Sequence, residues 1–249
     1  LEEQGRGVPD LAAQGTVPPF HVRAREGNPL CRMAEGREMC HDMEPGMKDF
    51  LVIAHRGASH LAPENTVPAF RMAMDLKADM IETDIRLSAD QVPVLSHDAD
   101  IKRITGTTLP IHELTLTELL GYDFGSWFSD KFAGTRIPTL EDLLALTKGT
   151  IPLNLEIKKD DPRSQGIEEK VLETVTAKDM EDQVLMSCFD LHALEIVRDL
   201  RPAIRIGVLY DGSGTWKPFL DRASELKAVS FHPQQQSVTP DMVHVFHSR

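Results

Sequence analysis

Charged side chains recur in this sequence inside or directly after short apolar runs, at spacings that could support catalysis. Glu82 and Asp84 stand two residues apart in one apolar run. Glu156 and Lys158 have the same spacing at the end of another. Residues two apart in a β-strand point to the same face. Each pair therefore predicts two charged groups side by side on one face of a strand.

Each of these features also has an ordinary structural explanation when it is taken alone. A solvated strand face would explain Glu82 and Asp84, and a simple ion pair would explain Glu156 beside Lys158. Together, however, three carboxylates on inward-facing strands would repel one another and be costly to bury. A hard divalent cation with oxygen ligands, Mg²⁺ or Ca²⁺, relieves that repulsion. The combination therefore predicts a metal site.

Two histidines and two cationic side chains accompany the carboxylates. His55 and Arg56 end the first apolar run, and His97 closes a shorter one. A lone histidine at a strand end is usually a structural residue, but a pair can act as general acid and base near neutral pH. Arg56 and Lys158 supply the positive charge that an anionic substrate requires. A metal, two cations and an acid/base pair together indicate phosphoryl chemistry.

The elements that must position these side chains alternate between apolar strands and amphipathic helices. We expect six strands, at residues 50–54, 80–85, 151–157, 184–189, 204–210 and 228–231. Such alternation predicts an α/β fold with a parallel sheet and helical crossovers. A closed β/α barrel needs eight strands. The pattern alone therefore allows either an open doubly wound sheet or a barrel without its last two units.

Two segments depart from this alternation. Residues 91–138 interrupt it with a short strand at 92–96 and a helix opened by the capping-box pattern that starts at Thr115. Residues 1–46 contain scattered Gly and Pro and no sustained period. We expect 1–46 to be a disordered or non-native leader and the folded domain to span 47–249.

Composition limits the partners of the chain. The net charge of −12 over 249 residues argues against nucleic-acid binding, because an acidic surface repels phosphate backbones. No stretch approaches the roughly 20 apolar residues of a membrane span. Three separated cysteines predict no disulfide framework, so we expect a reducing, cytoplasmic location.

Five motifs occur in an order that resembles the glycerophosphodiester phosphodiesterase family. They are Ala54-His55-Arg56-Gly57-Ala58, Ala62-Pro63-Glu64-Asn65-Thr66, Ile81-Glu82-Thr83-Asp84, Val94-Leu95-Ser96-His97-Asp98 and Asn154-Leu155-Glu156-Ile157-Lys158. The resemblance runs from about Phe50 to the C-terminus, and smaller features such as Arg103 agree with it. A His-Arg-Gly triplet alone would be weak evidence for this family, but the five motifs in this order are specific to it.

The resemblance implies a TIM barrel with an insertion after the second strand, here about 91–138. It also implies roles at matching positions. The implied metal ligands are Glu82, Asp84 and Glu156. The implied acid/base histidines are His55 and His97. The implied phosphate contacts are Arg56 and Lys158, and the implied supporting residues are Glu64 and Asn65.

The implied reaction is metal-dependent hydrolysis of a small glycerophosphodiester to sn-glycerol 3-phosphate and an alcohol. One departure is that the family's seventh strand, with a Trp-Thr-Val-Asn-like segment, and its eighth strand have no counterpart here. We therefore expect a barrel truncated before strands seven and eight. That expectation leaves a second possibility, a catalytically inactive remnant or binding protein of the same fold. All the charged site positions are nevertheless present, which favours the enzyme.

Overall fold

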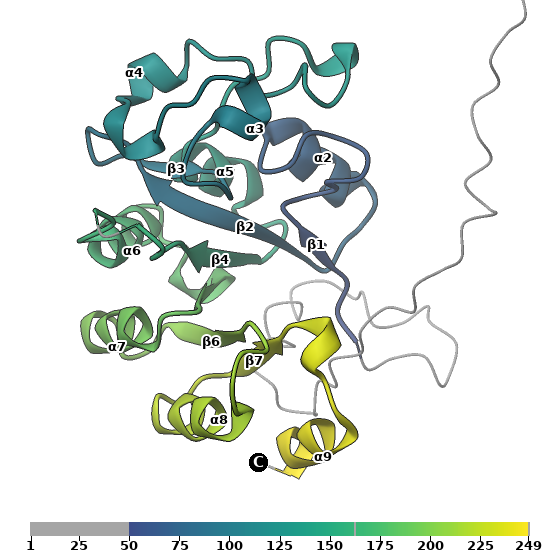
Figure 1. The fold of residues 1–249 in the computed structure, drawn as a ribbon, viewed down its shortest axis with the longest axis vertical. Coiled ribbons are helices and arrows are strands. Elements are labelled where there is room, and N and C mark those ends of the chain that lie inside the picture. The colour runs from purple at the N-terminus through teal and green to yellow at the C-terminus, as the bar shows by residue number, and fades with distance from the viewer. Residues whose placement is uncertain (1–49, 162, 249) are drawn as a thin grey trace, which may run out of the picture.

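Strands and helices alternate along the part of the chain that the structure, a computed structural model, describes: residues 50–161 and 163–248 (Figure 1). The expected leader at 1–46 lies outside the described residues. Six parallel strands pair in the order β1 (Ile53–His55), β2 (Met80–Leu87), β4 (Leu153–Ile157), β5 (Val184–Cys188), β6 (Arg205–Tyr210) and β7 (Ser230–Pro233). A short strand, β3 (Pro93–Leu95), pairs antiparallel with the end of β2. All the predicted strands are present.

The ends of the outer strands differ from the prediction. The sequence pattern places the first strand at 50–54 and the last parallel strand at 228–231, whereas β1 begins at Ile53 and β7 at Ser230. The inner strand β4 also begins later than predicted, at Leu153 and not at 151. Apolar side chains can continue beyond the residues that pair, so an apolar run is a poor guide to where a strand starts. The inner strands β2, β4 and β5 are buried along their whole length, as their continuous apolar runs predict.

Helices connect the parallel strands and cover the sheet. They are α2 (Val67–Asp75), α5 (Leu140–Thr147), α6 (Ile167–Ala177), α7 (Leu191–Leu200), α8 (Trp216–Glu225) and, after β7, α9 (Pro240–Ser248). A single large core lies between the helices and the sheet, with Phe70, Leu144, Leu155 and Val197 among its fully buried members. None of the helices among the described residues has the length and apolar composition that crossing a bilayer requires.

The strand order decides between the two architectures that the sequence allowed. Along the parallel sheet, each strand pairs with the parallel strand that precedes it in the chain. Right-handed crossovers in such a sequential order place every connecting helix on the same side of the sheet. A doubly wound sheet instead reverses its order at a switch point and has helices on both faces. The described sheet is therefore of the β/α-barrel type, and α6, α7 and α8 follow one side of it in Figure 1.

The segment between β3 and α5 forms a small layer with its own core. It contains α3 (Lys102–Thr105), η2 (Ile111–Glu113), α4 (Leu116–Leu119) and η3 (Asp130–Phe132). Ile111, Leu119 and Ile137 of this segment pack together with Val94 of β3. The predicted capping box is present: the Thr115 hydroxyl accepts a hydrogen bond from the Glu118 backbone N–H. The layer lies above the ends of β2 and α5 in Figure 1.

Candidate active site

Three carboxylates meet on the face of the sheet turned away from the core helices. Glu82 and Asp84 lie in β2, and Glu156 in β4 stands directly beside Asp84 in the strand register. Each of the three offers one oxygen, and these oxygens all lie within 4.8 Å of one another. The side chains are buried, with at most 8% of any of these residues exposed. The structure thus brings together the three residues that the sequence pattern singled out as metal ligands.

The charges in this cluster are only partly compensated. Burial raises the pKa of Glu82 well above its usual range, and the negative charge of the neighbouring Asp84 adds to this shift. Burial also raises the pKa of Glu156, although Lys158 opposes the shift. For Asp84, burial acts in the same direction, but Lys158 and Asn65 outweigh it and the pKa falls. Burial therefore disfavours the charged form of Glu82 and Glu156, and a further positive charge would favour it.

The cluster fits a divalent cation. Glu82 Oε2 accepts a hydrogen bond from the Arg56 backbone N–H at 2.9 Å. Its second oxygen, Oε1, is buried and has no hydrogen-bond partner among the described residues. A buried carboxylate oxygen without a partner costs free energy. A hard cation with oxygen ligands would satisfy this oxygen and neutralise the repulsion at once.

Arg56 and Lys158 lie against the same carboxylates. Lys158 Nζ is 2.8 Å from Asp84 Oδ1, and it also pairs with Glu156. Arg56 Nε is 3.3 Å from Asp84 Oδ2. Both side chains are less than one-fifth exposed, so their charges act in a setting with little screening by water. The two predicted phosphate contacts are therefore adjacent to the acidic cluster.

A tight turn after β1 explains the His-Arg-Gly triplet. Arg56 has a φ of 57° and Gly57 a φ of 78°, both in the left-handed region. A Cβ on residue 57 would come within 2.8 Å of Ala69 in α2. Only glycine combines this backbone conformation with such a close approach to the helix. The turn directs the Arg56 backbone N–H at Glu82 and its side chain at Asp84.

Glu64 and Asn65, the predicted supporting residues, hold the cationic and acidic groups in place. Asn65 Nδ2 donates to Asp84 Oδ2 at 2.8 Å, while its Oδ1 accepts from the Thr83 hydroxyl at 2.7 Å. Glu64 Oε1 accepts from Arg56 Nη1 at 2.9 Å. The two side chains thus touch the predicted metal ligand and the predicted phosphate contact directly.

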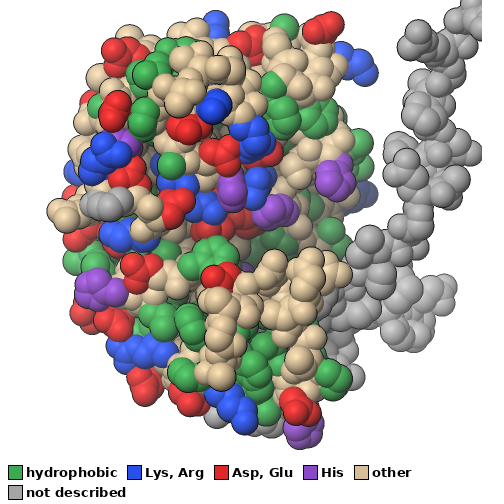
Figure 2. All heavy atoms as spheres, viewed as in Figure 1, with side chains coloured by type: hydrophobic (Ala, Val, Ile, Leu, Met, Phe, Trp, Pro, Cys, Tyr) green, Lys and Arg blue, Asp and Glu red, His purple; other side chains and the backbone are tan. Residues whose placement is uncertain are grey.

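The two histidines lie at the rim of the cluster. His97 Nδ1 is 2.8 Å from Asp98 Oδ1, and Arg103 Nε donates to the other oxygen of Asp98 at 2.6 Å. His55 Nε2 is 3.9 Å from Glu82 Oε2, and its side chain is largely exposed. Histidine, basic and acidic side chains gather near the middle of the face seen in Figure 2. His55 therefore borders the carboxylates directly, and His97 lies near enough to Glu156 for its charge to lower the pKa of that carboxyl group.

A cavity adjoins the cluster on its β4 and β5 side. Its volume is about 440 Å³, and its lining includes Glu156, Lys158 and the exposed ring of Phe189. This volume falls in the range of small-ligand pockets. The cavity opens a space beside the carboxylates for the remainder of a substrate.

One site residue was missed by the sequence reasoning. Arg86 follows Asp84 by two residues in β2, so it belongs to the same face. Its side chain is 6% exposed and bonds both the His97 carbonyl and Asp160. The alternation that singled out Glu82 and Asp84 could have found Arg86, but an arginine at a strand end is more often a solvated residue.

The fold and this site define a β/α-barrel protein with an acidic centre suited to a cation. The family model of the glycerophosphoryl diester phosphodiesterase family matches residues 55–249. A glycerophosphodiester phosphodiesterase of Caldanaerobacter subterraneus subsp. tengcongensis is 38% identical over 194 residues, which are 78% of this chain and 79% of that relative. A glycerophosphodiester phosphodiesterase of Bacillus altitudinis is 35% identical over 160 residues, 64% of this chain and 65% of that one.

Solved structures agree with these relatives. An Oleispira antarctica phosphodiesterase, solved in complex with the product sn-glycerol-3-phosphate, superposes with a TM-score of 0.69 at 29% identity over 80% of each chain. The chain belongs to the glycerophosphoryl diester phosphodiesterase family.

Proposed function

We propose that this chain is a metal-dependent phosphodiesterase that hydrolyses glycerophosphodiesters to sn-glycerol 3-phosphate and an alcohol. Its enzyme class is then that of the phosphoric diester hydrolases, the class to which its named relatives belong. The observation that carries the proposal is the cluster of three buried carboxylates within 4.8 Å, with Arg56 and Lys158 against it. The sn-glycerol-3-phosphate bound to the similar Oleispira protein supports the substrate class.

The metal would be held by Glu82, Asp84 and Glu156. A bound divalent cation supplies charge neutralisation at the phosphoryl oxygens, which is the largest electrostatic demand of this reaction. Both Mg²⁺ and Ca²⁺ take such carboxylate oxygens. Titration of the metal-free protein with each cation, followed by thermal unfolding, distinguishes the two.

Arg56 and Lys158 bind the phosphate in this proposal. Arginine carries five N–H donors in a planar fork. Glu64 pairs with Nη1 and Asp84 with Nε, and Nη2 would donate to phosphate oxygens. Lys158 carries three donors, of which two point at Asp84 and Glu156. Both cations are thus oriented before a substrate arrives, which reduces the entropic cost of binding it.

His55 and His97 exchange protons with the substrate and with water. In this proposal Nε2 of His97 transfers the proton, because Nδ1 is already engaged with Asp98. Arg103 holds Asp98 from its other side, so the imidazole keeps its orientation. His55 lies beside Glu82, with Nε2 3.9 Å from Glu82 Oε2. In this proposal one histidine acts as the general base and the other as the general acid.

The test is an assay of the full chain against a panel of glycerophosphodiesters, with and without a chelator. We expect release of glycerol 3-phosphate that stops when the cation is removed and resumes when it is returned. Activity that is equal in excess chelator would overturn the metal assignment. A chain that binds the cation but turns over no diester would favour the alternative, an inactive binding protein of the same fold.

The domain boundaries belong to the same proposal. We place the catalytic domain at 47–249, with residues 91–138 as the family insertion, and treat 1–46 as a separate leader. The small layer between β3 and α5, with its own core, supports the insertion. Removal of 1–46 should leave kcat and the melting temperature unchanged. A loss of either would assign the leader to the domain.

We infer that the six parallel strands belong to a β/α barrel, which closes with eight strands. Among the described residues, β1 pairs in parallel only with β2, and β7 pairs only with β6. Two further strands between β7 and β1 would close the barrel.

We also place the protein in a reducing, cytoplasmic compartment, where the buried thiol of Cys188 stays free. Detection of the native protein in a secreted fraction would contradict that location.

A further inference from the structure

The guanidinium of Arg86 joins two loops at the rim of the site. Its Nε donates to the His97 backbone carbonyl at 3.0 Å, and Nη2 donates to the same oxygen at 2.6 Å. Its Nη1 and Nη2 donate to the two carboxylate oxygens of Asp160 at 2.7 and 2.9 Å. The arginine belongs to β2, whereas His97 follows β3 and Asp160 follows β4. One side chain thus ties three separate segments of the fold together.

The burial of the two partners is unequal. The Arg86 side chain is 6% exposed, and that of Asp160 is 62% exposed. The fork therefore lies inside the protein and reaches outward to the loop after β4. Charge-assisted, bidentate hydrogen bonds of this kind fix geometry more strongly than neutral single ones. A lysine could supply the charge but could not make two bonds to the His97 carbonyl and two to Asp160 at once, because its ammonium is a single point of charge on a flexible stem.

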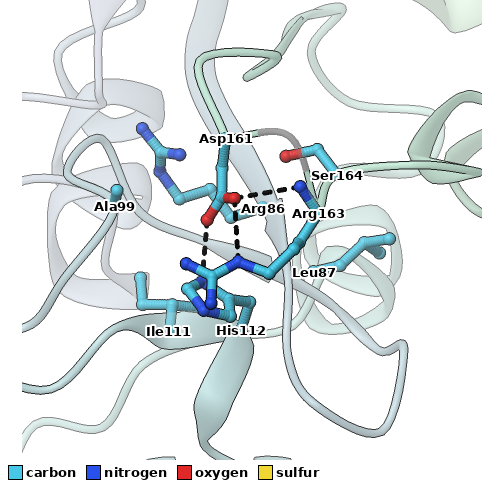
Figure 3. A pocket seen from close by; sticks show the side chains of 8 residues that line it. All are labelled: Arg86, Leu87, Ala99, Ile111, His112, Asp161, Arg163 and Ser164. Atoms are coloured by element: carbon cyan, nitrogen blue, oxygen red, sulfur yellow. Dashed lines mark hydrogen bonds and ion pairs between the residues drawn. The ribbon is translucent and has the colours of Figure 1, made fainter.

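A second contact ties the same loop to the insertion. Asp161, next to Asp160, lies 2.7 Å from Nδ1 of His112 in η2. Asp161 also accepts from the backbone N–H and from Nε of Arg163, as the dashed lines of Figure 3 show. The cavity among these side chains measures only about 10 Å³, the space of about one water. The cluster is therefore a joint between segments and has no room for a ligand.

Arg86 matters for the site because each of the two loops that it joins carries a candidate site residue. The loop after β3 carries His97, and the strand end before Asp160 carries Lys158. In the proposed function these residues transfer a proton and bind the phosphate. Their relative position decides whether the ring of His97 faces the bound diester. A misplacement of about 1 Å can cost a factor of about 100 in rate.

We propose that Arg86 is a positioning residue that holds the His97 loop and the loop after Lys158 at a fixed separation across the mouth of the site. The inference rests on the proposed function for its effect on rate, but the joint itself is a property of the fold. It assigns to Arg86 a role in kcat without any contact with the substrate. Asp160 is its partner in that role.

The test compares Arg86→Lys, Asp160→Asn and the control Arg163→Gln in the full chain. The control removes an arginine that bonds the same loop through Asp161 but does not touch His97. With sn-glycero-3-phosphocholine as the probe, Arg86→Lys should lower kcat by roughly 10- to 100-fold and leave KM within about threefold. Asp160→Asn should lower kcat several-fold, and Arg163→Gln should leave it unchanged.

Combining Arg86→Lys with His97→Ala distinguishes a positioning role from a general loss of structure. If Arg86 acts through His97, its substitution should cost less than about twofold in kcat once the imidazole is absent. An equal cost in both backgrounds, or no cost in either, would overturn the proposal. If Arg86→Lys does not fold, the same comparison is made with Asp160→Asn, because the side chain of Asp160 lies at the exposed end of the contact.

Hydrogen–deuterium exchange gives a readout that does not depend on activity. Arg86→Lys should speed exchange of the backbone amides at 96–99 and at 158–161, whereas Arg163→Gln should leave 96–99 unchanged. Unchanged exchange at both segments in Arg86→Lys would show that no joint exists there, even if the enzyme is active. If exchange is faster in Arg86→Lys but the parent chain has no phosphodiesterase activity, the joint exists and the proposed function is refuted instead.

Discussion

At the scale of single residues, the site concentrates like charges that the fold alone does not neutralise. Glu82 is the least compensated of the three carboxylates, because burial raises its pKa and Oε1 has no partner among the described residues. Glu82→Gln should therefore raise the melting temperature of the metal-free protein and abolish the further rise on adding Mg²⁺ or Ca²⁺. Thermal unfolding with and without each cation measures both effects.

Glu168→Gln is the matched control for that experiment. Glu168 is equally buried but pairs with Lys159 at 2.9 Å, away from the three carboxylates. Removing its charge should lower the melting temperature, because the lysine loses its partner, and should leave the response to the cation intact. If Glu82→Gln behaves like Glu168→Gln, the carboxylate cluster is a structural network and not a metal site.

The histidines support a second prediction at this scale. His55→Ala and His97→Ala should each lower kcat by roughly 10²- to 10⁴-fold, the usual range for the loss of an acid or base. The pH–rate profile of the parent should be bell-shaped, and each variant should lose one limb. His192→Ala, which removes a largely exposed histidine on α7, should change neither kcat nor the profile. Near-parental turnover in either site variant would remove that histidine from the mechanism.

At the scale of elements, local capping interactions stabilise the helices that support the sheet. The Thr139 hydroxyl accepts from the Asp142 backbone N–H at 3.1 Å, and Asp142 Oδ2 accepts from the Thr139 backbone N–H at 2.9 Å. This capping box starts α5, whose Leu140, Leu143 and Leu144 are fully buried in the core.

Thr139→Ala should lower the free energy of unfolding by about 0.5–2 kcal/mol, the usual cost of losing an N-cap hydroxyl. The kcat of the folded protein should stay within about twofold, because the cap touches none of the site residues. Thr139→Ser keeps the hydroxyl and should retain most of the stability in urea denaturation. Equal losses in the alanine and serine variants would mean that the methyl group, and not the cap, is what matters.

At the scale of the whole molecule, stability should depend on pH through a histidine far from the carboxylates. Burial lowers the pKa of His232 in β7 to about 4 from its ordinary value of 6.5. Its Nε2 lies 2.8 Å from the Ser230 hydroxyl, over Gly207 of β6. Between pH 6.5 and 4 the unfolded chain binds this proton more readily than the folded one. Acidification through that window therefore favours unfolding.

The free energy of unfolding should fall more between pH 7 and pH 5 in the parent than in His232→Asn, by on the order of 1–2 kcal/mol. Urea denaturation at the two pH values measures the difference, in which the contributions of the other titrating groups cancel. His192→Asn should show the same fall as the parent. An identical fall in parent and His232→Asn would mean that the ring is hydrated in the folded protein.

The sequence predicts structure well where the interacting residues lie within a few positions of each other in the chain. Alternation in β2 placed Glu82 and Asp84 on one face, and the caps at Thr115 and Thr139 were readable because donor and acceptor are three residues apart. The start of α2 does not follow this pattern. Thr66 takes the N-cap position of α2, but its hydroxyl donates to the Pro63 carbonyl and caps no helix N–H.

What the sequence by itself determined was the set of strands, most helix starts and the strand face on which Glu82 and Asp84 lie, because periodicity and local hydrogen bonds depend on neighbours in the chain. Only the tertiary structure decided that the sheet winds in one direction, that Asn65 holds Asp84, and that Arg86 reaches Asp160. Asn65 and Asp84 are 19 residues apart, and Arg86 and Asp160 are 74 apart. Such contacts exist only once β1, β2 and β4 lie side by side, and no local pattern records which strand will be the neighbour.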